Sequence, residues 1–289
     1  MKSDAAIAYC RDLVAAPGSD LYYATLFASP PEKARLYSLH AFAAELARIP
    51  RAASDPGVAR VKLAWWQEDV ARIRRGPEHP VTTALIHTGV HEALEPRVFD
   101  QLADAVEQLL NRAALPDMDA VIDAHRRFEG TLWRATARLL GSSDAETLGS
   151  AEVLGCALGL SDTLRRLHEQ LTAGVARLPT RDLANHGLTL ETLLAQPQHT
   201  GISGIATLIT GHARKLVLEG LHGLPHGQPL AQLPFLIMVE IAVKTLAEIQ
   251  IDGFRLLERH TALTPLRKLW IAIKIRHREQ RLHRRLNRL

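Results

Sequence analysis

A helical spacing of apolar residues runs through nearly the whole chain, and it constrains the fold more than any other feature. Apolar side chains recur every three to four residues, which is typical of helices, whereas the alternating pattern of half-buried strands is absent. Alanine and leucine dominate the composition, and both favour helix. The sequence therefore predicts an all-α protein. The helices are expected at roughly 4–15, 31–49, 55–75, 80–93, 98–113, 118–140, 145–172, 200–222, 231–258 and 264–287.

The breaks in this pattern are short. Proline, glycine and small polar residues interrupt it at 17–18, 55–57, 76–77 and 141–144. None of these breaks is long enough to be a flexible interdomain linker. A chain of 289 residues could form one large domain or two small ones. Because no linker separates two halves, we predict one helical domain over residues 1–289.

Charge and cysteine content exclude several classes of protein. The formal net charge is +4 and the isoelectric point is about 9.3, which suits an anionic membrane surface, a diphosphate ligand or nucleic acid. Cys10 and Cys156 are the only cysteines, so neither a disulfide framework nor a cysteine metal site is available. The sequence contains no phosphate loop, dinucleotide fingerprint or serine nucleophile elbow. Only the basic carboxyl end favours nucleic acid, and no nucleic-acid partner is expected.

No segment is typical of a secretory signal or a membrane span. The N-terminus carries acidic residues and lacks a long apolar core. The most apolar stretch, 233–251, is interrupted by Glu240, Lys244 and Glu248, whereas a transmembrane helix needs about 20 nearly uncharged residues. We therefore expect a soluble or peripheral protein in the cytoplasm, with a peripheral position at the inner membrane as an open alternative.

The carboxyl end, from about residue 264 to 289, predicts a strongly basic helix. Its apolar residues are spaced so that several could lie along one side. This pattern is typical of helices that bind a membrane surface or a protein partner. It also fits a final core helix with a solvated, arginine-rich end, and both interpretations stay open. The apolar side would carry Trp270, Ile273, Leu282, Leu286 and Leu289.

One histidine pair raises the question of a metal site. His87 and His91 lie one helical turn apart and are followed by Glu92, so zinc binding is conceivable. No third ligand is evident in the sequence. An exposed histidine pair is therefore the favoured interpretation, and no metal site is predicted.

Six segments, spread over most of the chain, share the order and spacing of one protein family. They are Ser19–Phe42, Leu63–Val70, Phe128–Trp133, Gly155–Gln170, Leu178–Leu183 and Pro265–Trp270. They resemble the squalene/phytoene synthase family. The resemblance implies an isoprenoid-synthase-type fold, a single bundle of α-helices around a central cavity. For an active enzyme it implies head-to-head condensation of two allylic diphosphates.

The resemblance also implies how such an enzyme works. Magnesium ions bridge carboxylates and diphosphate oxygens and neutralise the charge of the leaving group. Two facing helices each present acids three to four residues apart, which places them on one face. The cavity below is apolar, because it holds prenyl chains and shields carbocations from water. Five aromatic residues are candidates for its lining, with ordinary core packing as the alternative: Tyr22, Tyr23, Trp65, Trp66 and Trp133.

The first acidic motif of the family is lost in this chain. The positions where the resemblance implies acids hold Ala47, Arg48 and Arg51, and only Glu45 remains nearby. Pro50 is expected to disrupt or end the helix at this point. Arginines in place of carboxylates remove metal ligands and repel a metal ion.

The second motif is altered in the same sense. Its acids would fall at Arg166, Glu169 and Gln170, and Asp162 takes the place of an asparagine. Arg165 matches a basic residue of the family. A magnesium cluster of the family kind cannot be assembled from these residues. We therefore predict no metal and no cofactor, with magnesium needed only if the protein is an active enzyme.

The remaining charges allow two interpretations. Asp162 with Arg166, and Arg165 with Glu169, are i,i+4 pairs that stabilise a helix by about 0.2–0.5 kcal/mol each. The favoured interpretation is a solvated, ion-paired helix face. Alternatively, four arginines face the mouth of the cavity and bind an anion without a metal, because arginine matches phosphate oxygens with two parallel hydrogen bonds. These are Arg48, Arg51, Arg165 and Arg166.

One branch of the family has lost these aspartates, namely proteins resembling the mitochondrial complex I assembly factor of phytoene-synthase type. The segment Gly159–Pro179 resembles that branch in its spacing. The resemblance implies a non-catalytic bundle that binds a protein partner or a prenyl lipid at a membrane, in support of respiratory complex assembly. The alternative is a prenyltransferase with a rebuilt diphosphate site. Its acids would be Glu45, Glu129, Asp162 and Glu169.

Overall fold

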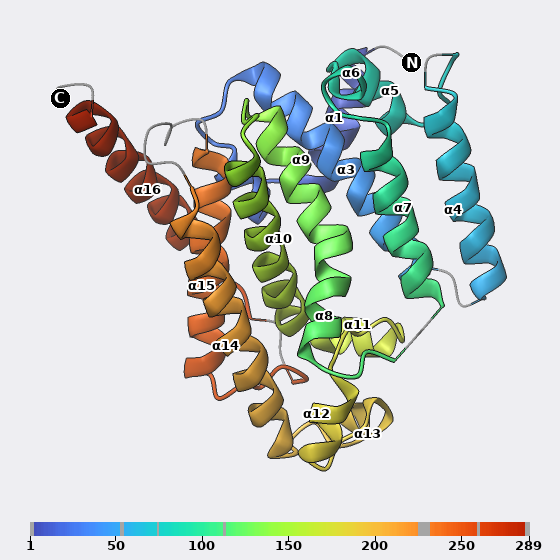
Figure 1. Ribbon diagram of the computed structural model, residues 1–289, viewed down its shortest axis with the longest axis vertical. Coiled ribbons are helices and arrows are strands. Elements are labelled where there is room, and N and C mark those ends of the chain that lie inside the picture. The colour runs from blue at the N-terminus through green and yellow to red at the C-terminus, as the bar shows by residue number, and fades with distance from the viewer. Residues whose placement is uncertain are drawn as a thin grey trace.

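The computed structural model describes residues 3–52, 55–73, 75–111, 114–224, 232–258 and 261–286. They form an all-α protein, as the periodicity predicts, and Figure 1 shows the helices gathered into one bundle. The larger helices are α1 (Ser3–Val14), α3 (Pro30–Ala52), α4 (Pro56–Ala71), α5 (Pro80–His87), α7 (Arg97–Leu110), α8 (Met118–His125), α9 (Thr131–Leu139), α10 (Ala145–Arg165), α14 (Gly201–His222), α15 (Leu233–Ile251) and α16 (Pro265–Leu286). The shorter ones are α2 (Asp20–Ala24), α6 (Val90–Ala93), α11 (Leu167–Thr172), α12 (Thr180–Asn185) and α13 (Leu190–Ala195). The single domain over residues 1–289 stays a prediction.

Several helices begin where an acidic side chain accepts hydrogen bonds from their free N–H groups. Asp144 accepts from the N–H of Thr147 at 2.7 Å, at the start of α10. Asp117 accepts from the N–H of Ala120 at 3.1 Å, at the start of α8. A cap of this kind stabilises a helix by about 1 kcal/mol. The caps therefore fix the start of two helices that position the candidate site.

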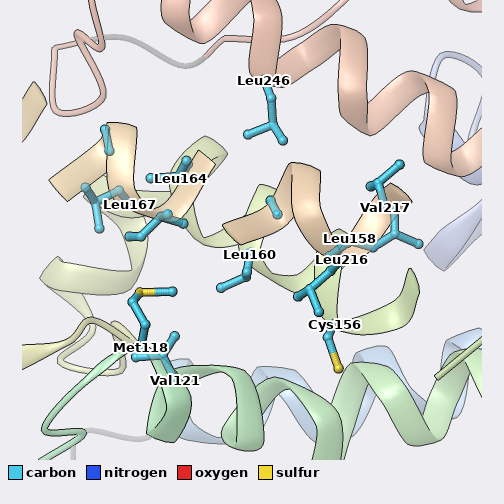
Figure 2. Close-up of a cluster of buried hydrophobic side chains, with 14 of the residues drawn as sticks. Met118, Val121, Cys156, Leu158, Leu160, Leu164, Leu167, Leu216, Val217 and Leu246 are labelled. Carbon is cyan, nitrogen blue, oxygen red and sulfur yellow. The ribbon is translucent and has the colours of Figure 1, made fainter. Parts of the chain in front are cut away.

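α10 is the central helix of the fold and packs against α9, α14 and α15. Figure 2 shows part of the apolar cluster that it forms, in which Leu160 and Leu164 of α10 are buried together with Leu216 of α14 and Leu246 of α15. A fully buried leucine stabilises the fold by about 1.5–3 kcal/mol. A second cluster joins α1, α3, α4, α5 and α7, and a third joins α2, α15 and α16.

Three of the predicted helices are shorter or divided, for local reasons. The predicted helix 80–93 divides into α5 and α6 at Gly89, which has a left-handed φ of 70°. The predicted helix 145–172 divides at Arg166, between α10 and α11. The predicted helix 231–258 ends at Ile251, because Gly253 and Phe254 have φ values of 71° and 58° that a right-handed helix cannot contain.

The predicted helix 118–140 is continuous in the structure but contains a π-helical turn. α8 passes through this turn, η1 (Arg126–Gly130), into α9. Such turns are rare and often lie at functional sites. Three short helices, α2, α12 and α13, lie in segments for which no helix was predicted.

Pro50 does not end α3, and the expectation that it would is wrong. The helix continues to Ala52, and Ile49 and Pro50 are both buried. Proline removes the single hydrogen bond that its N–H would donate, and its fixed φ is close to the helical value. The lost hydrogen bond and the crowding of the preceding carbonyl by the ring cost stability, and the packing of the two buried side chains offsets this cost. Arg48 and Arg51 consequently lie on one continuous helix.

α16 packs by one side and leaves the other side exposed. Ile271 and Ile275 are buried, whereas the side chains of Leu266 and Trp270 are 78% and 61% exposed. Ile273 is exposed too. Figure 1 shows the carboxyl end of α16 projecting away from the bundle. Leu282, Leu286 and Leu289 were predicted to share the apolar side, but their side chains are not among those that the structure describes.

Within the described ranges, no helix is both long enough and apolar enough to span a membrane.

Candidate functional site

A cavity of about 1290 Å³ lies between the helices that carry the altered motifs. α3 and α7, the π-turn η1, the end of α10 and the α11–α12 segment supply its walls. Apolar side chains cover much of the lining. The charged residues of the lining are five arginines and three acids: Arg48, Arg51, Arg127, Arg166, Arg177, Glu129, Asp162 and Glu191.

The α3 wall combines small side chains with cations. Ala43 and Ala47 line the cavity, and their small side chains leave space within it. Arg48, at the edge of the cavity, donates to Glu45 at 3.3 Å. Glu45 also accepts from the hydroxyl of Tyr9 at 3.0 Å. The one acid left in the first motif is therefore already engaged by partners within the chain.

Arg51 enters the cavity without a carboxylate partner in the part of the chain that the structure describes. Its Nε donates to the carbonyl of Ala47 at 3.1 Å, and its side chain is half-buried. Burial lowers the pKa of Arg51, and the like charges of Arg166 and Arg177 lower it further, while nearby acids oppose them. The guanidinium still carries its charge at neutral pH. Its positive potential is therefore available to an anion.

Arg165 does not share this cavity, contrary to the expectation that it lies there with three other arginines. It donates to Asp20 at 2.8 Å and to Asp162 at 2.6 Å. Asp20 also pairs with Lys268 of α16 at 2.7 Å. Arg165 therefore joins α10 to α2 and, through Asp20, to α16.

Arg166 lines the cavity at the break between α10 and α11. Its Nε donates to Glu169 at 3.0 Å, and its Nη1 lies 3.9 Å from Asp162. The predicted pair between Asp162 and Arg166 is present. The predicted pair between Arg165 and Glu169 is wrong, because the helix breaks at Arg166 and Glu169 pairs with that residue. The side chain of Glu169 is 53% exposed, so it faces solvent.

Glu129 is held by three hydrogen bonds at the π-turn. Arg177 donates to both of its oxygens, at 2.6 and 2.9 Å, and Nδ1 of His125 lies 2.9 Å from Oε2. Burial alone would raise the pKa of Glu129, but Arg177 and His125 outweigh it and lower the pKa to about 2. The carboxylate is therefore ionised and engaged, and it neither binds a metal freely nor takes up a proton near neutral pH.

His125 completes this buried network as a neutral ring. Burial lowers the pKa of His125, and Arg177 lowers it further, against the opposing charge of Glu129. With Nδ1–H donating to Glu129, Nε2 accepts from the hydroxyl of Thr163, which lies 3.2 Å away. Every polar group of the network therefore has a partner.

Arg177 and His125 were not among the site residues predicted from the sequence. Two glycines of α10 are the signal that could have indicated a closely packed network beside this helix. A Cβ on Gly155 would lie 2.5 Å from the carbonyl oxygen of Glu129. A Cβ on Gly159 would collide with the ring of His125. Only glycine lets α10 approach the π-turn this closely.

Gln170 occupies the last acidic position of the second motif. Its side chain is 7% exposed and lines the cavity from α11. Its Oε1 is buried and has no hydrogen-bond partner in the described part of the chain. A buried polar atom left without a partner costs about 1–3 kcal/mol. This amide is therefore a candidate for contact with a bound molecule.

His40 lines the cavity from α3 as a neutral ring. Its Nε2 lies 3.0 Å from the hydroxyl oxygen of Thr136, and the ring contacts Trp133 edge to face. Burial lowers the pKa of His40 to about 4. The ring is therefore uncharged at neutral pH and contributes no charge to the cavity.

The aromatic residues considered for the cavity lining lie in the core instead. Tyr22 and Tyr23 contact each other edge to face, with ring centroids 5.1 Å apart, and pack with the α15–α16 cluster. Phe128 of the π-turn is the aromatic residue that lines the cavity. The three tryptophans follow the core-packing alternative: Trp65, Trp66 and Trp133.

The acids around the cavity do not fit the magnesium cluster that the family resemblance implies. The charges of Glu129 and Asp162 are matched by arginines of the same chain. In the described ranges, no group of three or more His, Cys, Asp or Glu side chains could hold a metal ion. His91 instead lies 3.7 Å from Glu92 and 3.3 Å from the carbonyl oxygen of Leu85.

The chain is similar in sequence and in fold to several known proteins. The chain is 23% identical over 264 residues to NADH dehydrogenase (ubiquinone) complex I, assembly factor 6, from Bos taurus, covering 89% of this chain and 79% of that protein. It is 26% identical over 175 residues to presqualene diphosphate synthase from Rhodopseudomonas palustris, covering 60% and 62%. A dehydrosqualene synthase crystallised with a ligand matches with a TM-score of 0.82 at 17% identity, covering 96% of this chain and 98% of that one. The family model for squalene/phytoene synthase matches residues 14–268, and the chain therefore belongs to the squalene/phytoene synthase family.

Proposed function

We propose that this protein is a non-catalytic member of its family, a helical bundle that binds a lipid or a protein partner at a membrane. One observation carries the proposal: each of the four candidate acids is paired with an arginine of the same chain. The pairs are Glu45 with Arg48, Glu129 with Arg177, Asp162 with Arg165, and Glu169 with Arg166.

This pairing opposes the ionisation of an allylic diphosphate by metal ions. Magnesium needs free carboxylate oxygens in near-octahedral geometry. At the cavity, Glu129 is held on both oxygens and Asp162 lies between two arginines. A metal ion placed there would have to displace these arginines and would be repelled by them.

The exposed side of α16 supports a position at a membrane surface. Leu266, Trp270 and Ile273 are spaced four and three residues apart, so they form one apolar stripe. Lys274 lies over the ring of Trp270, 5.0 Å from its centroid. Basic residues dominate the rest of the helix, a combination typical of helices that lie on anionic bilayers.

The similarity to the bovine assembly factor supports a role in assembling a respiratory complex. It extends over 264 residues, so it includes both altered motifs and the cavity between them. We propose a cytoplasmic protein, peripheral to the inner membrane, that supports complex I assembly.

A prenyltransferase with an altered diphosphate site is the second candidate. The retained cavity and the similarity to presqualene diphosphate synthase favour it. Its candidate acids are Glu45, Glu129, Asp162 and Glu169, and of these Glu129 and Asp162 line the cavity.

Incubation of the purified protein with farnesyl or geranylgeranyl diphosphate and magnesium distinguishes the two candidates. We expect no turnover, with the Rhodopseudomonas palustris presqualene diphosphate synthase as the positive control. Turnover that Asp162→Ala or Glu169→Ala abolishes would overturn the non-catalytic proposal. Deletion of the gene should lower the amount of assembled complex I, and Arg166→Asp should fail to restore it.

A further inference from the structure

The cavity has a positive end, where α3 meets the end of α10 and the start of α11. Arg177 is neutralised there by Glu129, and Arg166 is partly neutralised by its neighbouring acids. Arg51 retains two terminal nitrogens with no hydrogen-bond partner among the described residues. Its pKa is lowered by burial and by Arg166, so the two cations lie within electrostatic reach of each other.

Gln170 adds an independent indication of a ligand at this end. It follows Arg166 by one helical turn, and its backbone N–H donates to the carbonyl of Arg166 at 3.0 Å. Its buried side-chain oxygen lacks a partner in the described structure, although the residue lines the cavity. An amide can both donate and accept, so it can bind an oxygen of a ligand head group.

The remainder of the cavity suits an apolar chain. Its volume of about 1290 Å³ exceeds the roughly 300–1,000 Å³ of common small-molecule sites. Leu13, Val14, Leu109 and Leu132 are among the side chains that line it. Burial of a hydrocarbon chain is favourable in such surroundings, because each CH₂ removed from water contributes about 0.8 kcal/mol.

We infer that the cavity binds a single-chain amphiphile with an anionic head, and that Arg51, Arg166 and Gln170 hold this head without a metal ion. Guanidinium groups match the oxygens of phosphates and carboxylates with paired hydrogen bonds. They supply directly the positive charge that a metal ion would otherwise bring. This inference rests on the proposed function, a non-catalytic bundle that binds a lipid or a protein partner, and it deepens it by assigning a lipid to the cavity.

Calorimetric titration of the purified full-length protein in EDTA tests the inference. Farnesyl phosphate and palmitate serve as probes that separate a phosphate head from a carboxylate head, and farnesol is the neutral probe. We expect at least one anionic probe to bind in EDTA, at least tenfold more tightly than farnesol. Binding that appears only after magnesium is added, equal binding of farnesol, or no binding of either anionic probe would each overturn the inference.

Two variants locate the head group. Arg51→Gln should weaken binding of the anionic probe at least tenfold, and Gln170→Leu should weaken it severalfold, while farnesol binding changes little. Arg138→Gln is the matched control, because it removes one exposed arginine that lies outside the cavity. Arg51 makes no ion pair within the described ranges, so its replacement should leave the melting temperature unchanged. Equal affinity in Arg51→Gln and wild type would contradict the proposed site.

The same preparations separate this inference from the proposed function. Turnover of farnesyl diphosphate with magnesium would refute the non-catalytic proposal, yet metal-free binding that depends on Arg51 would still support the anion site. Conversely, an inactive protein that binds no anionic probe would refute the site and leave the non-catalytic proposal intact.

Discussion

Arg177 holds both oxygens of Glu129, at 2.6 and 2.9 Å, across 48 residues of sequence. The pair joins the π-turn between α8 and α9 to the segment that follows α11. It neutralises a carboxylate at the wall of the cavity and fixes a cation there at the same time. Arginine–carboxylate pairs within the chain thus organise the site.

Replacement of Glu129 should weaken the fold strongly. Its pKa of about 2 in the folded protein lies below the ordinary value of 4.5, so its contribution to stability is present above pH 4.5 and is lost as the pH falls toward 2. Glu129→Gln leaves Arg177 buried without a charge partner, and we expect a loss of about 3 kcal/mol in the free energy of unfolding at pH 7. Urea titration of the variant and the wild type measures this loss in the free energy of unfolding.

The control for that experiment is Glu169→Gln, which breaks an exposed pair and should change stability by less than about 1 kcal/mol. A double variant, Glu129→Gln with Arg177→Met, should recover part of the loss, because it leaves no unpaired charge. Equal effects of Glu129→Gln and Glu169→Gln would contradict the buried network.

Gly159 should tolerate no side chain. Gly159→Ala drives a methyl group into the ring of His125, so we expect a loss of about 1–3 kcal/mol of stability and a disturbed π-turn. Gly149→Ala is the matched control on the same helix, where a Cβ meets nothing within 4 Å. That change should stabilise the protein slightly, because alanine favours helix by about 1 kcal/mol over glycine. Thermal unfolding of the two variants measures the contrast.

Stability should fall in mild acid because of His40. Burial lowers the pKa of His40 from 6.5 to about 4, so the folded state binds fewer protons than the unfolded chain between these values. Its contribution is fully present above pH 6.5 and is lost as the pH falls toward 4, a change of about 3 kcal/mol. Burial lowers the pKa of His125 too, so His40→Gln should reduce the pH dependence without abolishing it.

Urea titrations at a series of pH values measure the effect of His40→Gln. The exposed His168 provides the control, and His168→Gln should leave the pH dependence unchanged. A pH dependence identical in His40→Gln and wild type would show that the ring is not held neutral by its burial.

The exposed stripe of α16 should bind anionic vesicles. Trp270 is 61% exposed, whereas Trp66 and Trp133 are 6% and 5% exposed and Trp65 packs partly buried against the core, so a blue shift of tryptophan fluorescence would report mainly on Trp270. We expect the shift with vesicles that contain phosphatidylglycerol and not with phosphatidylcholine alone. Leu266→Ser should weaken binding about tenfold, through the loss of one buried leucine.

Leu218→Ser is the matched control for vesicle binding. Leu218 of α14 is 71% exposed, comparable to Leu266, but belongs to a different helix. Equal losses in the two variants would indicate non-specific adsorption rather than docking by α16.

Periodicity alone predicted the long helices, because burial of one apolar face decides both their existence and their length. It failed at Arg166 and at the pair Gly253 and Phe254, where the local backbone conformation ends a helix that the apolar pattern would continue. The family resemblance located the two altered motifs, and Arg48, Arg51 and Arg166 do line one cavity. Arg177 was missed because it lies in an irregular segment, where no period indicates which way a side chain points.

Asp20 accepts a hydrogen bond from Arg165 at the end of α10 and also pairs with Lys268 of α16. One carboxylate therefore connects the helix that ends at the cavity with the helix that carries the exposed apolar stripe. If α16 shifts at a bilayer, Lys268 moves away from Asp20 and leaves this carboxylate to Arg165, one residue before Arg166. Such a shift would link occupancy of the cavity thermodynamically to attachment at a surface. If ligand binding changes the affinity for the bilayer by some factor, binding to the bilayer changes the affinity for the ligand by the same factor.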